Sequence, residues 1–392
     1  MATSFPTLPG VKIKEVALSA PPISGVGTST AGFVGVAPLK GQFTMVARLV
    51  TSFDQFVQDY INDPGGDPTK NATKSTDLSF AVFGFFQNGG NECYVVNTDS
   101  AAAADFVKGV KLLEKNSDVE IIAAPGSTDA TVYKALEDQA FAQADRFAIL
   151  DSPAKVDDLT KLTAGGGSRP PDSIWAAFYY PRIQVTPMLK DDPPDTVKNP
   201  IFVAPTGHIA GVYARVDGNK GVHKAPANEI LLGALGVEHV LTDGDQNALN
   251  ADGVDAVRLF SAGPTVFGAR TVLVSTAADK TFLYVNVRRL TTYIEQSLKV
   301  GLRWAVFEPN NLPLRQKITR SVRAFLDGVW RDGALFGATA DEAYYVRFPD
   351  IFNTDADRAN GKLTIEIGLR VSYPAEFIIV RIGLLLQSAS TA

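Results

Sequence analysis

Few residues of this sequence have the type and spacing that catalysis or ligand binding requires. The three histidines, His208, His223 and His239, stand too far apart along the chain to form a local metal-binding motif. The sequence contains no Gly-Lys-Ser/Thr phosphate loop, and no dinucleotide-binding glycine motif follows a predicted strand. The segment GTSTA at 27–31 is one residue short of a nucleophile elbow and lacks the strand-to-helix setting of that motif. These patterns therefore indicate no catalytic function.

Two acidic segments, DGDQN at 243–247 and NTDAD at 353–357, begin like calcium-binding loops. A calcium loop needs glycine at its sixth position, where these segments have Ala248 and Arg358. The glutamate that the twelfth position requires is missing from both segments as well. We therefore interpret both as turns, and the sequence predicts neither a metal site nor a cofactor.

The composition bounds the class of protein. The chain has 392 residues, of which 45% are hydrophobic and 20% are charged, as in ordinary globular proteins. A formal net charge of −5 argues against nucleic acid as a partner, because phosphate binding requires a basic surface. A single cysteine, Cys93, excludes an internal disulfide and fits folding in a reducing cytoplasm. The uncharged stretch 16–39 contains prolines and glycines that fit neither a membrane span nor a signal peptide, so we interpret it as a loop leading into a strand.

Short apolar strands alternate with helical patterns through the first half of the chain. This alternation predicts βαβ units and a mostly parallel sheet, and therefore the α/β fold class. Ser52, with Gln55 three residues later, predicts the capped start of a helix. The candidate strands are 31–36, 93–96, 119–123, 147–150 and 175–179, and the candidate helices are 77–86, 101–114 and 130–143.

The last third contains two longer helical patterns, at 289–303 and 314–331. Apolar residues recur at helical spacing in the second, and three basic residues fall on the face opposite to them: Lys317, Arg320 and Arg323. A solvated helix face is the simpler interpretation of these basic residues. A contact surface for an acidic partner is the alternative.

Both ends of the chain have the pattern of β-strands. Apolar and polar residues alternate at 11–16 and again at 363–371, and a β-rich run follows at 377–382. Terminal strands can pair with other chains, or they can complete the sheet of their own chain. The pattern alone leaves both possibilities open.

A series of short blocks runs through the chain from residue 9 to about residue 380. They are PGV (9–11) with EV (15–16), GVGTSTAGFVG (25–35), FFQNGG (85–90) with CYVV (93–96), PTGHIAGVYAR (205–215), GVHKAPAN (221–228), FGART (267–271), NVRRL (286–290), WAVFEPN (304–310) and PAEF (374–377). In this order the blocks resemble the contractile tail sheath family of myophages, R-type bacteriocins and phage-like injection particles. Phe267 stands where the family often has Trp, and the chain is short for the family, with little room for extra outer domains.

The resemblance implies a compact mixed α/β sheath-subunit body with extended N- and C-terminal β-strand arms. In this family each arm completes a sheet of a neighbouring subunit, and an inner domain faces a tube through a helix. The implied divisions are 1–20 as an N-terminal linker arm with its strand at 11–16, 21–200 as an outer α/β part, 201–360 as an inner tube-facing α/β part, and 361–392 as C-terminal strands and a linker arm. The implied linker-strand residues are Val11, Ile13, Val16, Phe377, Ile379 and Ile382, and the implied tube-facing residues are Lys317, Arg320 and Arg323.

The resemblance also implies a function, in which the subunits polymerise helically around a tail tube and contract to drive it through a target envelope. The stretch 16–39 would then act as a hinge behind the N-terminal strand. The implied partners are copies of the chain, the tail tube protein, and baseplate and terminator or cap proteins, with no small-molecule substrate, nucleic acid or membrane insertion. Assembly is expected in the cytoplasm of a bacterial host, to form part of a virion tail or a phage-like extracellular particle. The alternatives are a tube or baseplate protein of the same particle, or an α/β enzyme with a cryptic site.

Overall fold

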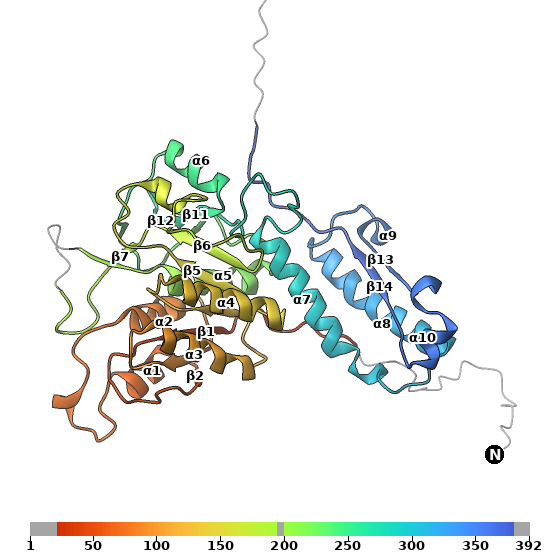
Figure 1. Ribbon diagram of the computed structural model, residues 1–392, viewed down its shortest axis with the longest axis horizontal. Coiled ribbons are helices and arrows are strands. Elements are labelled where there is room, and N and C mark those ends of the chain that lie inside the picture. Colours follow the sequence, from red (N-terminus) through yellow and green to blue (C-terminus); the bar gives the residue numbers. More distant parts are fainter. Residues whose placement is uncertain (1–21, 194–199, 380–392) are drawn as a thin grey trace, which may run out of the picture.

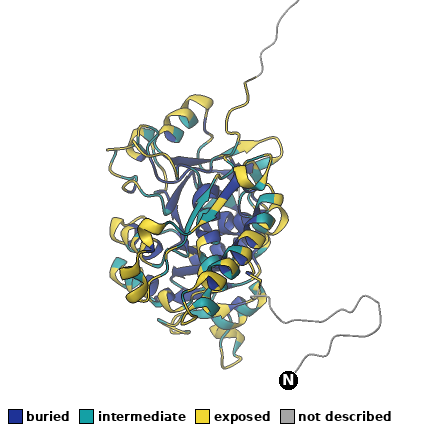
Figure 2. Ribbon diagram, turned by 90° about the vertical axis from the view of Figure 1, so that its right-hand side faces the viewer, coloured by how far each residue is buried: buried dark blue, intermediate teal, exposed yellow. Residues whose placement is uncertain are grey.

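A computed structural model describes residues 22–193 and 200–379 of the chain (Figure 1). Four of the predicted linker-strand residues, Val11, Ile13, Val16 and Ile382, lie outside the described residues, so their role stays a prediction. The described chain begins on one side of the molecule and ends on the opposite side, in both of two perpendicular views (Figures 1 and 2).

The centre of the molecule is a nine-stranded sheet with the order β2-β3-β1-β4-β5-β6-β11-β12-β9. The six strands from β3 to β11 run parallel, and β2, β12 and β9 add antiparallel pairs at the two edges. This mixed sheet confirms the predicted α/β class. The strands are β1 Ala31–Gly35, β2 Arg48–Val50, β3 Cys93–Asn97, β4 Ile121–Ala123, β5 Phe147–Asp151, β6 Ala176–Tyr180, β9 Glu229–Ile230, β11 Val254–Phe260 and β12 Gly263–Val266.

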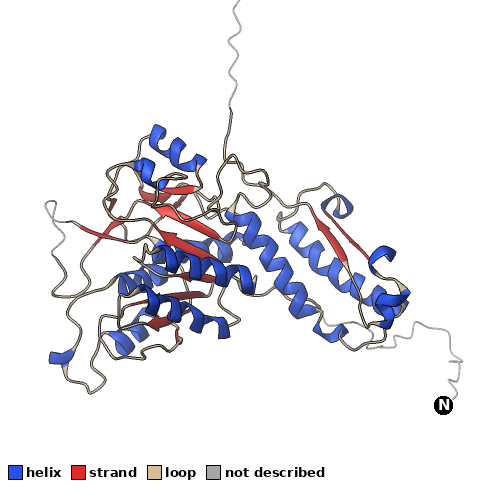
Figure 3. Cartoon of the chain, in the orientation of Figure 1, coloured by secondary structure: helices blue, strands red, loops and turns tan. Residues whose placement is uncertain are grey.

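Helices cover both faces of this sheet, as Figure 3 shows. Along β5, Phe147 and Ile149 enter one core while Ala148 and Leu150 enter the other, which explains why the central strands are apolar without alternation. The strands are buried between helices whose outer faces are exposed (Figure 2). The first face is covered by α1 Phe53–Tyr60, α2 Asp77–Gln87 and α5 Thr206–Lys220, and the second by α3 Ala103–Leu112, α4 Ala130–Gln143 and α6 Asp243–Ala251.

The helix starts follow local side-chain chemistry. Ser52 accepts a hydrogen bond from the backbone N–H of Gln55 and caps α1, as predicted. Thr242 and Thr354 cap α6 and α10 Asp355–Ala359 in the same way. The two acidic segments therefore begin helices, and our interpretation of them as turns is wrong. Their aspartates satisfy helix N-termini, where negative charge is favoured.

Helices α2 and α5 pack very closely against each other. A Cβ at Gly207 would lie 2.2 Å from the Cα of Ala81, and a Cβ at Gly211 would lie 2.5 Å from the carbonyl oxygen of Phe85. Only glycine allows the two backbones to approach so closely at these positions. Both glycines belong to the block at 205–215, so that part of the block is explained by packing.

The C-terminal part forms a separate core beside the sheet. It contains α7 Val285–Gly301, α8 Leu312–Arg331, α9 Ala340–Ala343, β13 Tyr344–Arg347, α10 and β14 Glu366–Leu369. In Figure 1, α7 lies between the nine-stranded sheet and the other elements of this C-terminal core. A three-stranded sheet, β10-β7-β8, completes the fold with β7 Ile183–Val185, β8 Ile201–Val203 and β10 Gly236–Val237.

The large sheet continues past residue 200, because β11, β12 and β9 belong to it. Packing therefore divides the described chain at α7, while the predicted boundary at 200/201 falls just before β8. Which part faces outward and which faces a tube stays a prediction. Among the helices of the described residues, none combines the length and apolar character that a membrane span needs.

Candidate assembly surfaces

The sheet formed by β13 and β14 has an outer edge without a partner. Val346 lies opposite Ile367, and the N–H of Arg370 donates to the carbonyl of Ala343 at 2.9 Å. This register directs the amides of Ile367 and Leu369 away from β13. No third strand within 22–193 and 200–379 pairs with this two-stranded sheet. The outer edge of β14 is therefore available for strand addition.

The inner face of this small sheet packs against the C-terminal core. The alternation predicted for 363–371 is present in part, because β14 covers only four of these residues. Each of the apolar residues is partly buried against the core that contains α8. These residues are Leu363, Ile365, Ile367, Leu369 and Val371. Since an isolated two-stranded sheet is marginally stable, a further strand would complete this layer.

Helix α8 has the predicted amphipathic pattern, with Leu314, Ile318 and Val322 among its buried residues. Its three basic residues differ in environment. The ammonium of Lys317 lies 5.5 Å from the centre of the Trp304 ring, and Arg323 pairs with Asp341 at 3.1 Å on the surface. Arg320 is exposed and has no partner among the described residues. Arg320 is therefore the member of the basic face whose charge is most available to a partner.

The described part of the C-terminal arm, up to residue 379, leaves the body without forming a strand. Residues 372–379 are assigned to no helix or strand, and the side chains of Phe377 and Ile379 are 72% and 83% exposed. Burying large apolar side chains such as these is favourable by roughly 1.5–3 kcal/mol each. Their exposure supports the prediction that they pack elsewhere, while their role as linker residues stays a prediction.

The N-terminal segment 22–30 packs along α7. The N–H of Val26 donates to the hydroxyl of Ser297 at 3.1 Å, and Arg289 donates to the carbonyl of Thr28 at 2.7 Å. A Cβ at Gly25 would lie 2.1 Å from the hydroxyl oxygen of Tyr293. From about residue 23 onward the Pro/Gly-rich stretch is therefore held in place, and our interpretation of this part as a hinge is wrong.

Two largely buried acidic groups lie next to the contact between residues 22–30 and α7. Asp217 of α5 accepts two hydrogen bonds from Arg289, at 2.6 and 3.0 Å, and the exposed fractions of the two side chains are 3% and 5%. Glu120 accepts the N–H of Thr30 at 3.0 Å, and burial raises the pKa of Glu120 to about 8. A neutral Glu120 leaves Asp217 as the main counter-charge of Arg289. The N-terminal segment, α5 and α7 are thereby joined.

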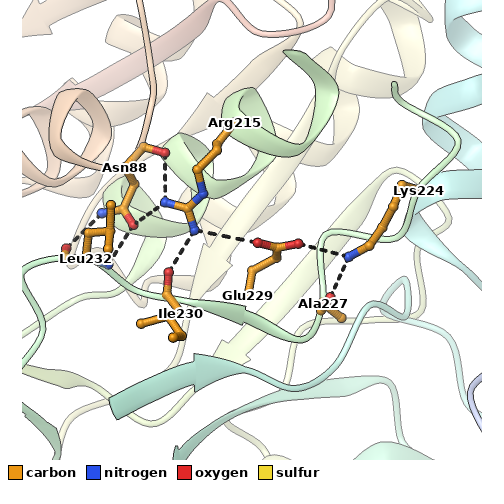
Figure 4. A network of polar contacts seen from close by, with 7 residues as sticks. All are labelled: Asn88, Arg215, Lys224, Ala227, Glu229, Ile230 and Leu232. Atoms are coloured by element: carbon orange, nitrogen blue, oxygen red, sulfur yellow. Dashed lines mark hydrogen bonds and ion pairs between the residues drawn. The ribbon is translucent and has the colours of Figure 1, made fainter. Parts of the chain in front are cut away.

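A second polar network holds the ends of α2 and α5 to the segment around β9 (Figure 4). Arg215 donates to the backbone and side-chain oxygens of Asn88 and to the carbonyl of Ile230. Lys224 and Arg215 both lie near Glu229, at 3.2 and 3.9 Å. Asn88, Arg215 and Lys224 come from three of the blocks that carry the resemblance. Those blocks therefore meet in space to stabilise the fold.

Burial and a hydrogen bond define the surroundings of two of the three histidines. His208 is buried, and burial lowers its pKa to about 4, so the imidazole is neutral at physiological pH. His239 lies with its Nδ1 2.7 Å from the hydroxyl of Tyr180. Within 22–193 and 200–379, no group of three His, Cys, Asp or Glu residues is placed to hold a metal ion.

Among the described residues, the fold and these surfaces define a structural α/β subunit with an unpartnered sheet edge and exposed apolar residues at 377–379. The central domain of phage tail sheath proteins matches residues 96–272, and their C-terminal domain matches residues 277–384. The chain belongs to the phage tail sheath family and is a contractile sheath subunit. Membership of this family indicates a structural protein.

Solved relatives cover the whole fold. The helical sheath of the anti-feeding prophage in its contracted state is 30% identical, with a TM-score of 0.74, and the match covers 97% of this chain and 99% of that one. The sheath complex of the PVC extracellular contractile injection system, also contracted, is 27% identical with a TM-score of 0.75, over 97% and 98% of the two chains.

The matches to curated relatives cover a smaller part of each chain. The tail sheath protein of Burkholderia phage BcepMu is 30% identical over 205 residues, which are 50% of this chain and 40% of that protein. A putative prophage major tail sheath protein of Pseudomonas aeruginosa is 24% identical, over 67% of this chain and 64% of its own length. The match thus spans less than two thirds of either curated relative.

Proposed function

We propose that the chain polymerises head-to-tail into a helical sheath around a tail tube and contracts to drive that tube through a target envelope. The observation that carries this proposal is the outer edge of β14, which has no strand partner within residues 22–193 and 200–379 and lies beside the C-terminal core. A contact between unlike surfaces that does not close on itself generates a helical polymer. The two described chain ends lie on opposite sides of the body, which suits arms that reach different neighbours (Figure 1).

The proposed donors for this edge are the two arms. Val11, Ile13 and Val16 alternate with polar residues, and Phe377, Ile379 and Ile382 lie in the β-rich run at the other end. In strand addition, main-chain hydrogen bonds supply affinity and alternate side chains enter pockets. No residue in the described part of the chain accepts a hydrogen bond from the amides of Ile367 and Leu369, so they can make such bonds. Each arm would thus complete the sheet of a neighbouring subunit.

The tube-facing surface in this proposal is the exposed side of α8, within the predicted inner part 201–360. Its basic residues Lys317, Arg320 and Arg323 suit an acidic tube surface. Exposed ion pairs contribute only about 0–1 kcal/mol each, so such a contact can be released when the sheath contracts. The predicted outer part, 21–200, would face away from the tube.

The wider assembly follows from the relatives. One solved relative comes from a baseplate of the anti-feeding prophage and another from its helical sheath, so we include baseplate, tube and terminator or cap proteins among the partners. Assembly in the cytoplasm of a bacterial host is part of the same proposal. We further propose that the extended sheath is held by a kinetic barrier and that contraction moves compact subunits as rigid bodies.

The test is a proline at the outer edge of β14. Ile367→Pro removes the amide that an added strand would use, and an edge position tolerates proline. Ile367→Ala is the matched control, because it also loses the isoleucine side chain but keeps the N–H. We expect helical tubes by negative-stain electron microscopy from the parent chain and from Ile367→Ala, and none from folded Ile367→Pro.

A second variant tests the donor. Deleting residues 1–16 should leave a folded monomer that no longer polymerises, since the described body begins beyond them. Normal sheaths from this deletion, or from Ile367→Pro, would contradict strand exchange as the basis of assembly.

A further inference from the structure

Glu376 is held by three residues from separate parts of the fold. Its carboxylate accepts hydrogen bonds from Arg270 at 2.7 Å, from the hydroxyl of Tyr284 at 2.8 Å and from the side-chain amide of Asn250 at 2.8 Å. Asn250 lies in α6, Arg270 follows β12, and Tyr284 is the N-cap residue of α7. We call these four residues the Glu376 clamp.

Glu376 is the ion-pair partner of the largely buried Arg270. The side chain of Arg270 is only 9% exposed, and that of Glu376 is 22% exposed. The neighbouring carboxyl of Asp255 accepts the backbone N–H of Arg270, and burial raises the pKa of Asp255 well above its usual range. Burial alone would raise the pKa of Glu376 as well, but the bonds from Arg270, Asn250 and Tyr284 hold it below its usual value. The carboxyl group of Glu376 is therefore ionised at neutral pH.

The chain just before Glu376 is fixed to the C-terminal core. The N–H of Ser372 donates to the carbonyl of Ala334 at 3.0 Å, and its hydroxyl donates to the carbonyl of Gly333 at 2.9 Å. The ring of Tyr373 packs edge-on against Tyr284, with 6.3 Å between the ring centres. Residues 372–376 therefore cross from the C-terminal core to the large sheet and are held at both ends.

The three described residues beyond Glu376 lack such contacts. Phe377 and Ile379 are largely exposed, and neither makes a hydrogen bond within the described residues. We propose that Glu376 is a positioning residue: the Glu376 clamp fixes the point and direction at which the C-terminal arm leaves the body, so that the arm bends only beyond residue 376. This inference deepens the proposed function, because an arm with a fixed base reaches one neighbour at one angle.

The direct test measures the position of the arm in the monomer. Nitroxide labels are attached at Ala375→Cys, in the stretch that the clamp holds, and at Lys108→Cys on the exposed side of α3, while the buried Cys93 stays unlabelled. Double electron–electron resonance then gives the distance distribution at a concentration where the chain is monomeric. We expect a narrow distribution in the labelled parent and a broad one in Glu376→Gln. Tyr284→Phe, which removes one donor but keeps the ring, should be intermediate.

The control is Asp138→Asn, which removes the carboxylate of an exposed ion pair with Lys134 on α4 and should leave the distribution narrow. An unchanged distribution in both Glu376→Gln and Tyr284→Phe, with native circular dichroism, would overturn the clamp. Because this measurement uses monomers, its outcome does not depend on whether the chain forms a sheath.

Assembly is then measured with unlabelled chains. Loosening the arm lowers its effective concentration at the neighbouring subunit, so we expect Glu376→Gln to reduce the yield of ordered tubes by about tenfold. Parent-like yield from Glu376→Gln would contradict a role of the clamp in assembly. Failure of the parent itself to polymerise would instead contradict the proposed function and leave the distance result standing.

Discussion

Replacing Asp217 by Asn should destabilise the folded chain severely. The pair it forms with Arg289 is almost fully enclosed, with exposed fractions of 3% and 5%, and both oxygens of the carboxylate are used. Removing one partner of a buried ion pair typically costs about 3–5 kcal/mol, because the other charge stays buried without compensation. The remaining contacts of Arg289, the carbonyl of Thr28 and the Tyr213 ring 4.8 Å away, provide no negative charge.

The assay is unfolding in guanidinium chloride, followed by circular dichroism. Asp138→Asn is the matched control, since its ion pair with Lys134 is 62% and 72% exposed and should contribute about 0–1 kcal/mol. The double variant Asp217→Leu with Arg289→Met should recover most of the loss, because apolar residues of similar size can replace a buried ion pair. A change of less than about 1 kcal/mol in Asp217→Asn would refute the reasoning.

Three further predictions follow from packing and charge. Gly207→Ala should destabilise the chain by about 1–3 kcal/mol or more, because the added Cβ would meet the backbone of α2. Gly218→Ala in the same helix should be neutral or stabilising, because its added Cβ would meet nothing within 4 Å. Thermal unfolding compares the two variants. The pKa of Glu120 rises from 4.5 to about 8 on folding, so Glu120 makes the parent lose stability as pH rises between these values. Glu120→Gln should reduce this loss in unfolding curves measured across the range, while the slope from Glu137 and Asp151, whose pKa values are also raised, should remain. Reversing the three basic residues of α8, Lys317, Arg320 and Arg323, to Glu should reduce binding of the sheath to its tube in a sedimentation assay. The control reverses three exposed lysines of α3 and α4, Lys108, Lys111 and Lys134, and should not reduce this binding. Equal binding by both variants would make the α8 residues a solvated face.

Local elements of this fold can be predicted from the sequence because their determinants are short-range. Helix α8 follows from the helical spacing of Leu314, Ile318 and Val322, and the start of α1 follows from Ser52 and Gln55. The parallel sheet follows from the alternation of short strands with helices. The acidic segments were misinterpreted because aspartates near a threonine fit a turn and a helix N-terminus equally well.

Contacts between distant residues could not be predicted in this way. Arg270 and Glu376 are 106 positions apart, and Arg289 and Asp217 are 72 apart, so no local pattern joins them. Each arginine lies in a block that carries the family resemblance, which marks it as a candidate but does not name its partner. The packing of residues 22–30 on α7 was hidden for the same reason, because a Pro/Gly-rich composition indicates a loop and not what the loop contacts.

The most direct test of the account is a helical reconstruction by cryo-electron microscopy of the polymer formed by the full chain. We expect strands from neighbouring subunits to pair with the outer edge of β14, next to Ile367 and Leu369, and the Glu376 clamp to hold residues 372–376. A polymer in which both arms pair only with their own subunit, and bodies touch solely through side chains, would contradict it.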